Sequence, residues 1–209
     1  SPTVGLKLQI FLHSPEFAQK WPKATIYLDE GSMNNHIEKL RQGALDLCYN
    51  ALPAPDPTSQ LKLIPTSTAE IYATMLPSHP LAVLEKIDLH QLSDTDIILL
   101  DAKSCIQGQI MEEFQRLGIL PRIRSTHEQI FCMLNMVKLG NFVGFLNASD
   151  PIMRQYLTDI GLIIRPLDPP VTFATGFIVN TSRHLPKLAE ELIRFTRRLE
   201  AEEAAQKAQ

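Results

Sequence analysis

Apolar residues recur along the chain in two patterns, and the first of them predicts strands. Short runs in which apolar residues alternate with polar ones, or follow one another, are typical of strands. On this basis we expect strands over 24–30, 45–49, 61–64, 70–76, 97–100, 122–125, 142–146, 162–167 and 171–179. The run 97–100 is entirely apolar, which indicates a strand that helices bury on both faces.

The second pattern, with apolar residues every three or four positions, predicts helices between these strands. Most of the predicted helices have a start or stop signal of their own. Ser32 and Gly43 mark the start and end of a helix with Met33, Ile37 and Leu40 on one face, and Gly118 ends a helix over 106–117. Thr126 and Gln129 form a capping-box pattern before a helix over 130–137, which Gly140 ends. Pro151, after Ser149 and Asp150, starts the next helix, and Pro186 starts the last one. A short helical turn is expected over 87–92, and the proline-rich stretch 52–57 is expected to be a surface loop.

The alternation of strands and helices implies an α/β architecture with a mainly parallel sheet. Of the 209 residues, 44% are hydrophobic and 21% are charged, which fits one large domain or two small lobes. The apolar runs are far shorter than the roughly 20 residues of a membrane-spanning helix, and no charged-then-apolar leader opens the chain. A net charge of -3 argues against nucleic-acid binding by this chain itself.

Motifs that carry enzyme or metal chemistry are missing from the sequence. The nine glycines include no G-x-G pair and no glycine before Lys-Ser or Lys-Thr, so neither a dinucleotide fingerprint nor a P-loop is present. The six histidines are never closer than eleven residues, so no helix places two of them on one face as a zinc hydrolase requires. Cys48, Cys105 and Cys132 form no close pair, which favours a reducing compartment over a disulfide framework. We therefore expect no catalytic residues, no cofactor and no metal.

Four segments in register carry a resemblance to a known family. They are WPKATIYLDEG at 21–31, LRQGALDL at 40–47, MLPSHPLA at 75–82 and LGNFVGF at 139–145. Together they resemble the effector-binding domain of LysR-type transcriptional regulators. The sequence departs from the family at Asn147, where a proline often follows the glycine turn.

The resemblance implies the fold of type-2 periplasmic binding proteins, in which two α/β lobes are joined by two crossover strands and an effector lies in the cleft. Carried over, lobe I is 1–73 plus 171–209, lobe II is 74–170, and the crossovers lie near 72–76 and 172–179. A small anionic or polar metabolite would bind between the lobes and signal to an N-terminal winged helix-turn-helix domain, which this chain does not contain. The protein would then be a cytoplasmic homodimer or tetramer that contacts DNA only through that missing domain.

The start of the chain can be interpreted in two ways. Ser1 to Gly5 resembles the loop that follows the first strand in the family, so that strand would precede Ser1. Alternatively, the alternation of apolar residues over 4–12 predicts a strand, with a short helix starting at Ser14. Family spacing favours the first interpretation and local chemistry the second.

The resemblance also points to effector-binding residues at helix N-termini and on the second crossover. They are Ser1, Thr3, Ser104, Cys105, Thr126 beside Ser125, Phe145 as an apolar wall, and Thr175. The alternative for the Ser and Thr residues at helix N-termini is ordinary helix capping, for Phe145 it is core packing, and Thr175 could face solvent instead. For a dimer the family uses helices that correspond to 34–42 and 128–139, represented by Ile37 and Arg41, and by Met133 and Met136.

Cys105 allows a second function. It lies at the expected start of a helix, close to Lys103, and both features lower the pKa of a thiol. Peroxide-sensing members of the family resemble this stretch, although their second cysteine would fall at Phe114 here. A redox-sensing regulator, a periplasmic solute-binding protein of the same fold and an enzyme on a related scaffold are therefore the alternatives to an effector-binding domain.

Overall fold

The chain divides into two compact units. The computed structural model describes residues 8, 10–31, 33–54, 56 and 58–207. Unit 1 is formed by residues 1–68 and 174–209, and unit 2 by residues 69–173. The expected lobe boundaries, after residue 73 and before residue 171, differ from these by five and three residues.

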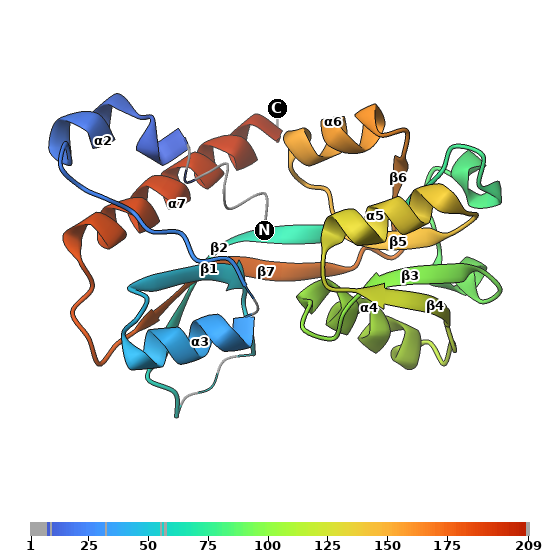
Figure 1. Cartoon of the computed structure of the whole chain (residues 1–209), viewed down its shortest axis with the longest axis horizontal. Coiled ribbons are helices and arrows are strands. Elements are labelled where there is room, and N and C mark those ends of the chain that lie inside the picture. Colours follow the sequence, from blue (N-terminus) through green and yellow to red (C-terminus); the bar gives the residue numbers. More distant parts are fainter. Residues whose placement is uncertain (1–7, 9, 32, 55, 57, 208–209) are drawn as a thin grey trace. The chain divides into compact units, whose positions relative to one another are not determined.

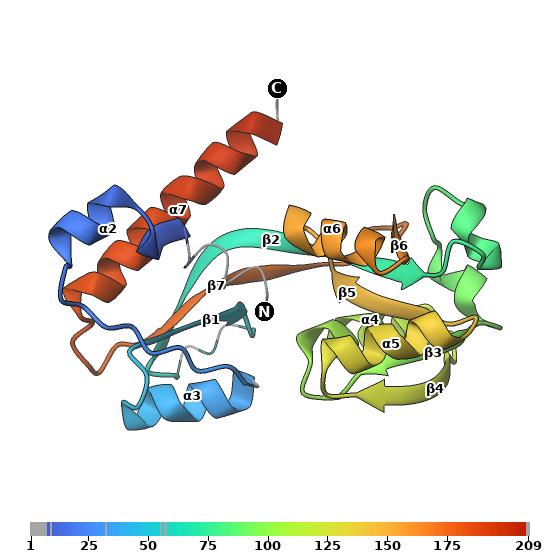
Figure 2. The ribbon, with the colours of Figure 1, turned by 45° about the horizontal axis from the view of Figure 1, so that its top comes forward.

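Unit 1 contains the two ends of the chain. Its elements are α2 (Pro15–Lys20), α3 (Met33–Gln42), β1 (Leu47–Ala51), the first part of β2 (Leu61–Met75), most of β7 (Thr172–Asn180) and α7 (Lys187–Lys207). Strand β1 pairs antiparallel with β7, with Leu47 opposite Val179 and Ala51 opposite Thr175. Strand β7 in turn neighbours β2, and the two strands run next to each other in Figures 1 and 2.

Two expectations for the first part of the chain are wrong. The segment 24–30 is extended but forms no strand, and its Tyr27 and Leu28 are 88% and 65% exposed. A strand exists only where a neighbour accepts and donates its backbone hydrogen bonds, and among the described residues β1 pairs with β7 alone. Of the alternative strand over 4–12, residues 10–12 are helical, whereas the short helix after Ser14 is confirmed as α2, with the Ser14 hydroxyl capping it.

Unit 2 is built on a sheet of its own. Its strands are the last part of β2, β3 (Asp96–Leu100), β4 (Arg122–His127), β5 (Val143–Asn147) and β6 (Ile163–Pro166). Strand β3 lies between β4 and β5 and is parallel to both, while β5 and β6 are antiparallel to β2. The α/β class is confirmed, and the parallel strand pairs of this unit are β3 with β4 and β3 with β5.

Strand β3 is buried on both faces, as its apolar sequence predicts. Ile97 and Leu99 pack in one core cluster with α4 (Cys105–Arg116), and Ile98 packs in another with α5 (Ile130–Leu139). Accordingly, α4 and α5 lie on opposite sides of β3 in Figure 1. Helix α6 (Pro151–Asp159) joins the α5 side and is capped by the Asp150 carboxylate. Two 3-10 helices, η1 (Pro80–Val83) and η2 (Leu89–Leu92), complete the unit.

Two of the glycines in strands stand where a larger residue would force its neighbours to move. A Cβ on Gly176 of β7 would lie 2.2 Å from the Ile64 carbonyl oxygen, so β7 and β2 touch backbone to backbone. A Cβ on Gly144 of β5 would lie 2.7 Å from the Met133 sulfur, so α5 sits directly on β5. No helix in the described part of the chain is long and apolar enough to cross a membrane.

Candidate functional site

In unit 2 the carboxyl ends of two parallel strands meet the start of a helix. Leu100 is the last residue of β3, and it lies opposite His127, the last residue of β4. The Asp101 N–H donates to the His127 carbonyl oxygen at 2.9 Å, which holds the loop after β3 beside the end of β4. Helix α4 begins four residues later, at Cys105. In α/β folds this edge is the usual place for ligands.

The N-terminus of α4 keeps hydrogen-bonding capacity that the helix itself does not use. Ser104 is the N-cap residue with an extended backbone, yet its hydroxyl makes no capping hydrogen bond. The N–H groups of a first helical turn have no carbonyl partner within the helix and carry the positive end of its dipole. Thr126, near the end of β4, is exposed. Ser104 and Thr126, predicted from sequence, therefore lie at the same edge of the sheet.

The expected capping box of Thr126 and Gln129 does not form. Strand β4 extends to His127, so Thr126 belongs to the strand. Gln129 is the N-cap of α5 and makes no side-chain capping bond. Beside Thr126, the Ser125 hydroxyl is instead hydrogen-bonded to His127 Nε2 at 2.9 Å.

A lysine supplies a positive charge next to this edge. Lys103 Nζ lies 2.5 Å from Glu128 Oε1 and 3.8 Å from Asp101 Oδ2. The hydrogen bond to Glu128 raises the pKa of Lys103 and lowers that of Glu128, so both groups are charged at neutral pH. The Lys103 side chain is 61% exposed, so this ion pair lies at the surface.

The thiol of Cys105 is not activated by its position. Burial raises its pKa above the ordinary value of 9.0, and the N–H groups of Ile106 and of Cys105 itself offset this only in part. The N–H groups at the start of the helix thus lower this pKa as expected, but burial outweighs them. Of the other cysteines, Cys132 is exposed, whereas Cys48 is buried and burial raises its pKa to about 11.

Thr175 lies in a different polar group, inside unit 1. It is 8% exposed, and its hydroxyl is hydrogen-bonded to Ser67 Oγ at 2.8 Å and to Tyr49 Oη at 3.2 Å. Tyr49 and Ser67 both also donate to Glu200 of α7. Sequence reasoning found Thr175 but missed Glu200, because nothing in a regularly charged helix marks one glutamate as buried.

Two of the predicted site residues are core residues. Phe145 is 1% exposed and packs edge to face against Phe114, with ring centroids 6.3 Å apart. Met133 is 0% exposed and lies under Gly144. Both side chains are closed off by their own unit, so Phe145 provides core packing and Met133 supports α5 from within.

The remaining predicted residues lie on helix surfaces or outside the described part of the chain. Ile37 on α3 and Met136 on α5 are half-buried, and Arg41 is exposed, 3.9 Å from Glu38. Ser1 and Thr3 lie outside the described residues. Ile37, Arg41 and Met136 thus lie on two different helices and not in the site at the N-terminus of α4.

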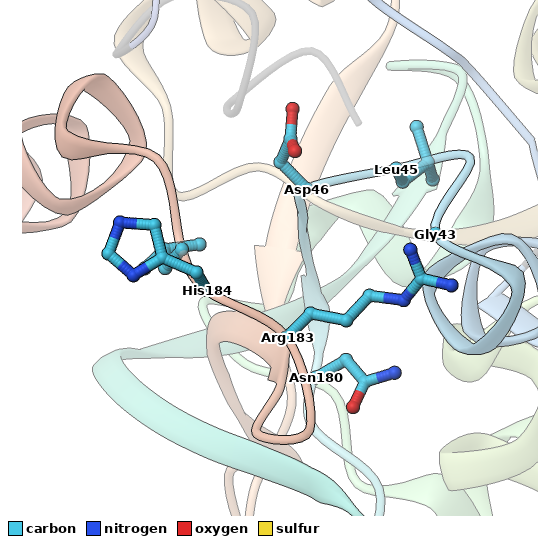
Figure 3. Close-up of a pocket in the computed structure, with 7 residues that line it drawn as sticks. Gly43, Leu45, Asp46, Asn180, Arg183 and His184 are labelled. Carbon is cyan, nitrogen blue, oxygen red and sulfur yellow. The ribbon is translucent and has the colours of Figure 1, made fainter.

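Unit 1 has two hollows that the sequence did not predict. One, of about 300 Å³, is lined by residues that include Asp46, Arg183 and His184. Figure 3 shows that Arg183 reaches toward Gly43, where it donates to the Gln42 carbonyl oxygen at 3.0 Å, while Asp46 and His184 point in other directions. The other is a groove of about 400 Å³ between 25–31 and 44–50. The charged groups of the first hollow do not converge on one point.

No group of three His, Cys, Asp or Glu side chains in the described part of the chain is arranged to hold a metal ion. The candidate site therefore offers backbone N–H groups, hydroxyls and one ammonium. Such an arrangement can hold a small anion or a hydroxylated molecule.

Comparison with protein families gives one match. The model described as "LysR substrate binding domain" matches residues 11–201. A Mycobacterium avium protein named "Probable hydrogen peroxide-inducible genes activator" is 28% identical over 109 residues, which are 52% of this chain and 34% of that protein. The HTH-type transcriptional regulator YybE of Bacillus subtilis is 26% identical over 144 residues, 69% of this chain and 49% of that protein. The chain thus spans between a third and a half of these relatives.

Solved structures share the fold at low sequence identity. The effector-binding domain of QuiR in complex with shikimate has a TM-score of 0.80 and 17% identity, covering 96% of this chain and 91% of that one. The regulatory domain of Synechocystis PCC6803 CcmR in complex with 2-PG has a TM-score of 0.77 and 17% identity, covering 94% and 90%. Full-length CbnR in complex with its target DNA has a TM-score of 0.74 and 16% identity, covering 94% of this chain and 66% of that one.

Proposed function

Because this chain belongs to the LysR substrate-binding domain family, we propose that it binds a small anionic or polar organic molecule and thereby controls a DNA-binding part of a longer regulator. The observation that carries the proposal is that the Ser104 hydroxyl, at the N-terminus of α4, makes no capping hydrogen bond. It supports a ligand site because a hydroxyl in an N-cap position normally bonds to its own helix.

The groups at this edge favour a carboxylate or phosphate that also carries hydroxyls. First-turn N–H groups and the helix dipole attract negative charge, and the Lys103 ammonium lies beside them, paired with Glu128. Ser104 and Thr126 can donate to or accept from ligand hydroxyls. Shikimate, found with the QuiR domain, has this combination of a carboxylate and hydroxyls.

The assembly we propose is a homodimer or tetramer in the cytoplasm. Ile37 and Arg41 on α3, and Met136 on α5, would contribute to the contacts between subunits, with Met133 holding α5 in place. The net charge of -3 is consistent with DNA contacts made by another part of the protein. Ligand binding would act by shifting a conformational equilibrium, which it can do only by its difference in affinity for the two states.

The alternatives drawn from sequence have less support. A redox sensor needs a thiolate, and burial keeps the Cys105 thiol protonated at neutral pH. A periplasmic solute-binding protein is disfavoured because the curated relatives above are named as regulators of gene expression. The same relatives and the missing catalytic motifs disfavour an enzyme.

The test is a thermal-shift titration of the chain with shikimate and a panel of other hydroxylated carboxylates and phosphates. A true ligand at 100 times its dissociation constant stabilises by about 2.7 kcal/mol, or about 5–10 °C in Tm. Ser104→Ala should weaken that ligand about 3- to 10-fold with little loss of stability, because the hydroxyl does not cap α4.

The matched control is Ser93→Ala, an exposed serine of the same unit. It should leave affinity unchanged. The proposal is contradicted if no member of the panel gives saturable stabilisation, or if Ser104→Ala and Ser93→Ala bind the ligand equally well.

A further inference from the structure

Two hydroxyl side chains of unit 1 donate to one carboxylate, and two further hydroxyls are hydrogen-bonded to them. Tyr49 comes from β1, Thr66 and Ser67 from β2, Thr175 from β7, and Glu200 from α7. Tyr49 Oη and Ser67 Oγ each donate to Glu200 Oε1 at 3.1 Å. Glu200 is 7% exposed, so the carboxylate lies inside the unit although α7 is otherwise rich in solvent-facing charge.

The carboxylate fixes the direction in which two of these hydroxyls donate. A hydroxyl has a single proton to donate, and an ionised carboxylate only accepts. Tyr49 and Ser67 give their protons to Glu200, so their oxygens are left to accept from Thr66 and Thr175, which lie 3.2 Å and 2.8 Å away. The carboxylate thus sets the orientation of the Tyr49 and Ser67 hydroxyls, whereas Thr66 and Thr175 can also donate to the carbonyl oxygens of Thr175 and Ser67.

The same geometry would bind a carboxylate that is not part of the chain. Hydroxyl donors directed at one oxygen recognise a small anion, and without Glu200 the half-buried Tyr49 and Ser67 hydroxyls would lose their charged acceptor. We propose that Tyr49, Thr66, Ser67 and Thr175 form a binding site for a small carboxylate, and that Glu200 fills this site as a ligand tethered to α7.

This site is distinct from the edge at α4, because all five residues belong to unit 1. It also lies at a sensitive point of the chain. Ser67 is two residues before β2 enters unit 2, and Thr175 is two residues after β7 leaves it. Glu200 therefore ties α7 to both strands where they pass from one unit to the other.

Removing the tethered carboxylate tests the proposal by chemical rescue. Glu200→Ala should lower Tm by about 5–10 °C, because the half-buried hydroxyls of Tyr49 and Ser67 lose their charged acceptor. Sodium acetate at pH 7.5 should then raise the Tm of this variant by about 2–4 °C more than sodium chloride at equal ionic strength, once acetate exceeds its dissociation constant about fourfold.

Two further variants separate the carboxylate site from a general effect of charge. Glu190→Ala removes an exposed glutamate from the same helix and should respond to acetate and chloride alike, as should the unsubstituted protein. Glu200→Gln keeps an acceptor oxygen in the site, so it should lose less stability than Glu200→Ala and gain nothing specific from acetate.

The proposal is overturned if acetate and chloride act equally on Glu200→Ala, which would make the hydroxyl group a packing feature only. It is equally overturned if acetate stabilises every variant to the same extent. Should Glu200→Ala be unfolded at 20 °C, the same comparison is made on the recovery of its circular dichroism as acetate or chloride is added, with recovery in acetate alone as the supporting result.

Discussion

Replacing Gly176 with alanine tests how closely β7 approaches β2. The added Cβ would lie 2.2 Å from the Ile64 carbonyl oxygen and 2.9 Å from Pro65 Cα. These are backbone atoms, so no side chain can rotate away to make room. The φ angle of Gly176 is one that alanine adopts freely, and the cost is therefore one of space alone.

We expect Gly176→Ala to destabilise unit 1 by about 1–3 kcal/mol, the usual cost of overpacking. In a domain of this length that corresponds to a fall in Tm of about 2–12 °C. The matched substitution is Gly108→Ala in α4, where a Cβ meets nothing within 4 Å. There alanine should stabilise by about 0.5–1 kcal/mol, because it is the better helix former.

Urea denaturation and scanning calorimetry of both variants measure the two effects. We expect Gly176→Ala to be less stable than the unsubstituted protein and Gly108→Ala to be more stable. Equal stability of Gly176→Ala and the unsubstituted protein would refute the backbone contact between β7 and β2.

Three other predictions concern a cap, the thiols and a histidine. Ser14→Ala should lower stability by about 1 kcal/mol in urea denaturation, because the hydroxyl caps α2; no loss would contradict that cap. Iodoacetamide at pH 8 should alkylate the exposed Cys132 first, then Cys105 and last Cys48, which peptide mass spectrometry can follow. Alkylation of Cys105 before Cys132 would support the redox alternative. Burial lowers the pKa of His79 below its ordinary 6.5, so the unfolded chain binds that proton more readily and stability falls as pH drops below about 6.5. His79→Asn should make the urea midpoint less dependent on pH between 7 and 5, and an unchanged slope would count against this assignment.

Elements with both a packing pattern and a terminal signal could be predicted from the sequence. The apolar run at 97–100 is the doubly buried β3, and the helices stopped by Gly43 and Gly118 end at Gln42 and Arg116. Both glycines have positive φ, which explains why glycine stands there. The segment 24–30 has the pattern of a strand but lacks a bonded neighbour, and pairing is a property of the fold that one segment does not encode.

Within the candidate site, only residues whose placement follows from the neighbouring sequence could be predicted. Ser104 follows directly from its place between a strand and a helix. Phe145 was ambiguous, since an aromatic residue after a glycine turn suits a ligand wall as well as a core, and only the packing against Phe114 distinguishes them. Glu200 could not be predicted, because its burial depends on hydroxyls of Tyr49 and Ser67 that lie more than a hundred residues earlier.

The two units differ in which parts of the chain form them. Unit 2 is one continuous stretch, 69–173, whereas unit 1 needs residues from both ends. During synthesis, unit 2 can fold as soon as it leaves the ribosome, but β1 must wait for β7, which is made about 120 residues later. Until then the early segments of unit 1 are exposed to chaperones and proteases, so a chain cut short before β7 would yield a folded unit 2 attached to an unfolded remnant.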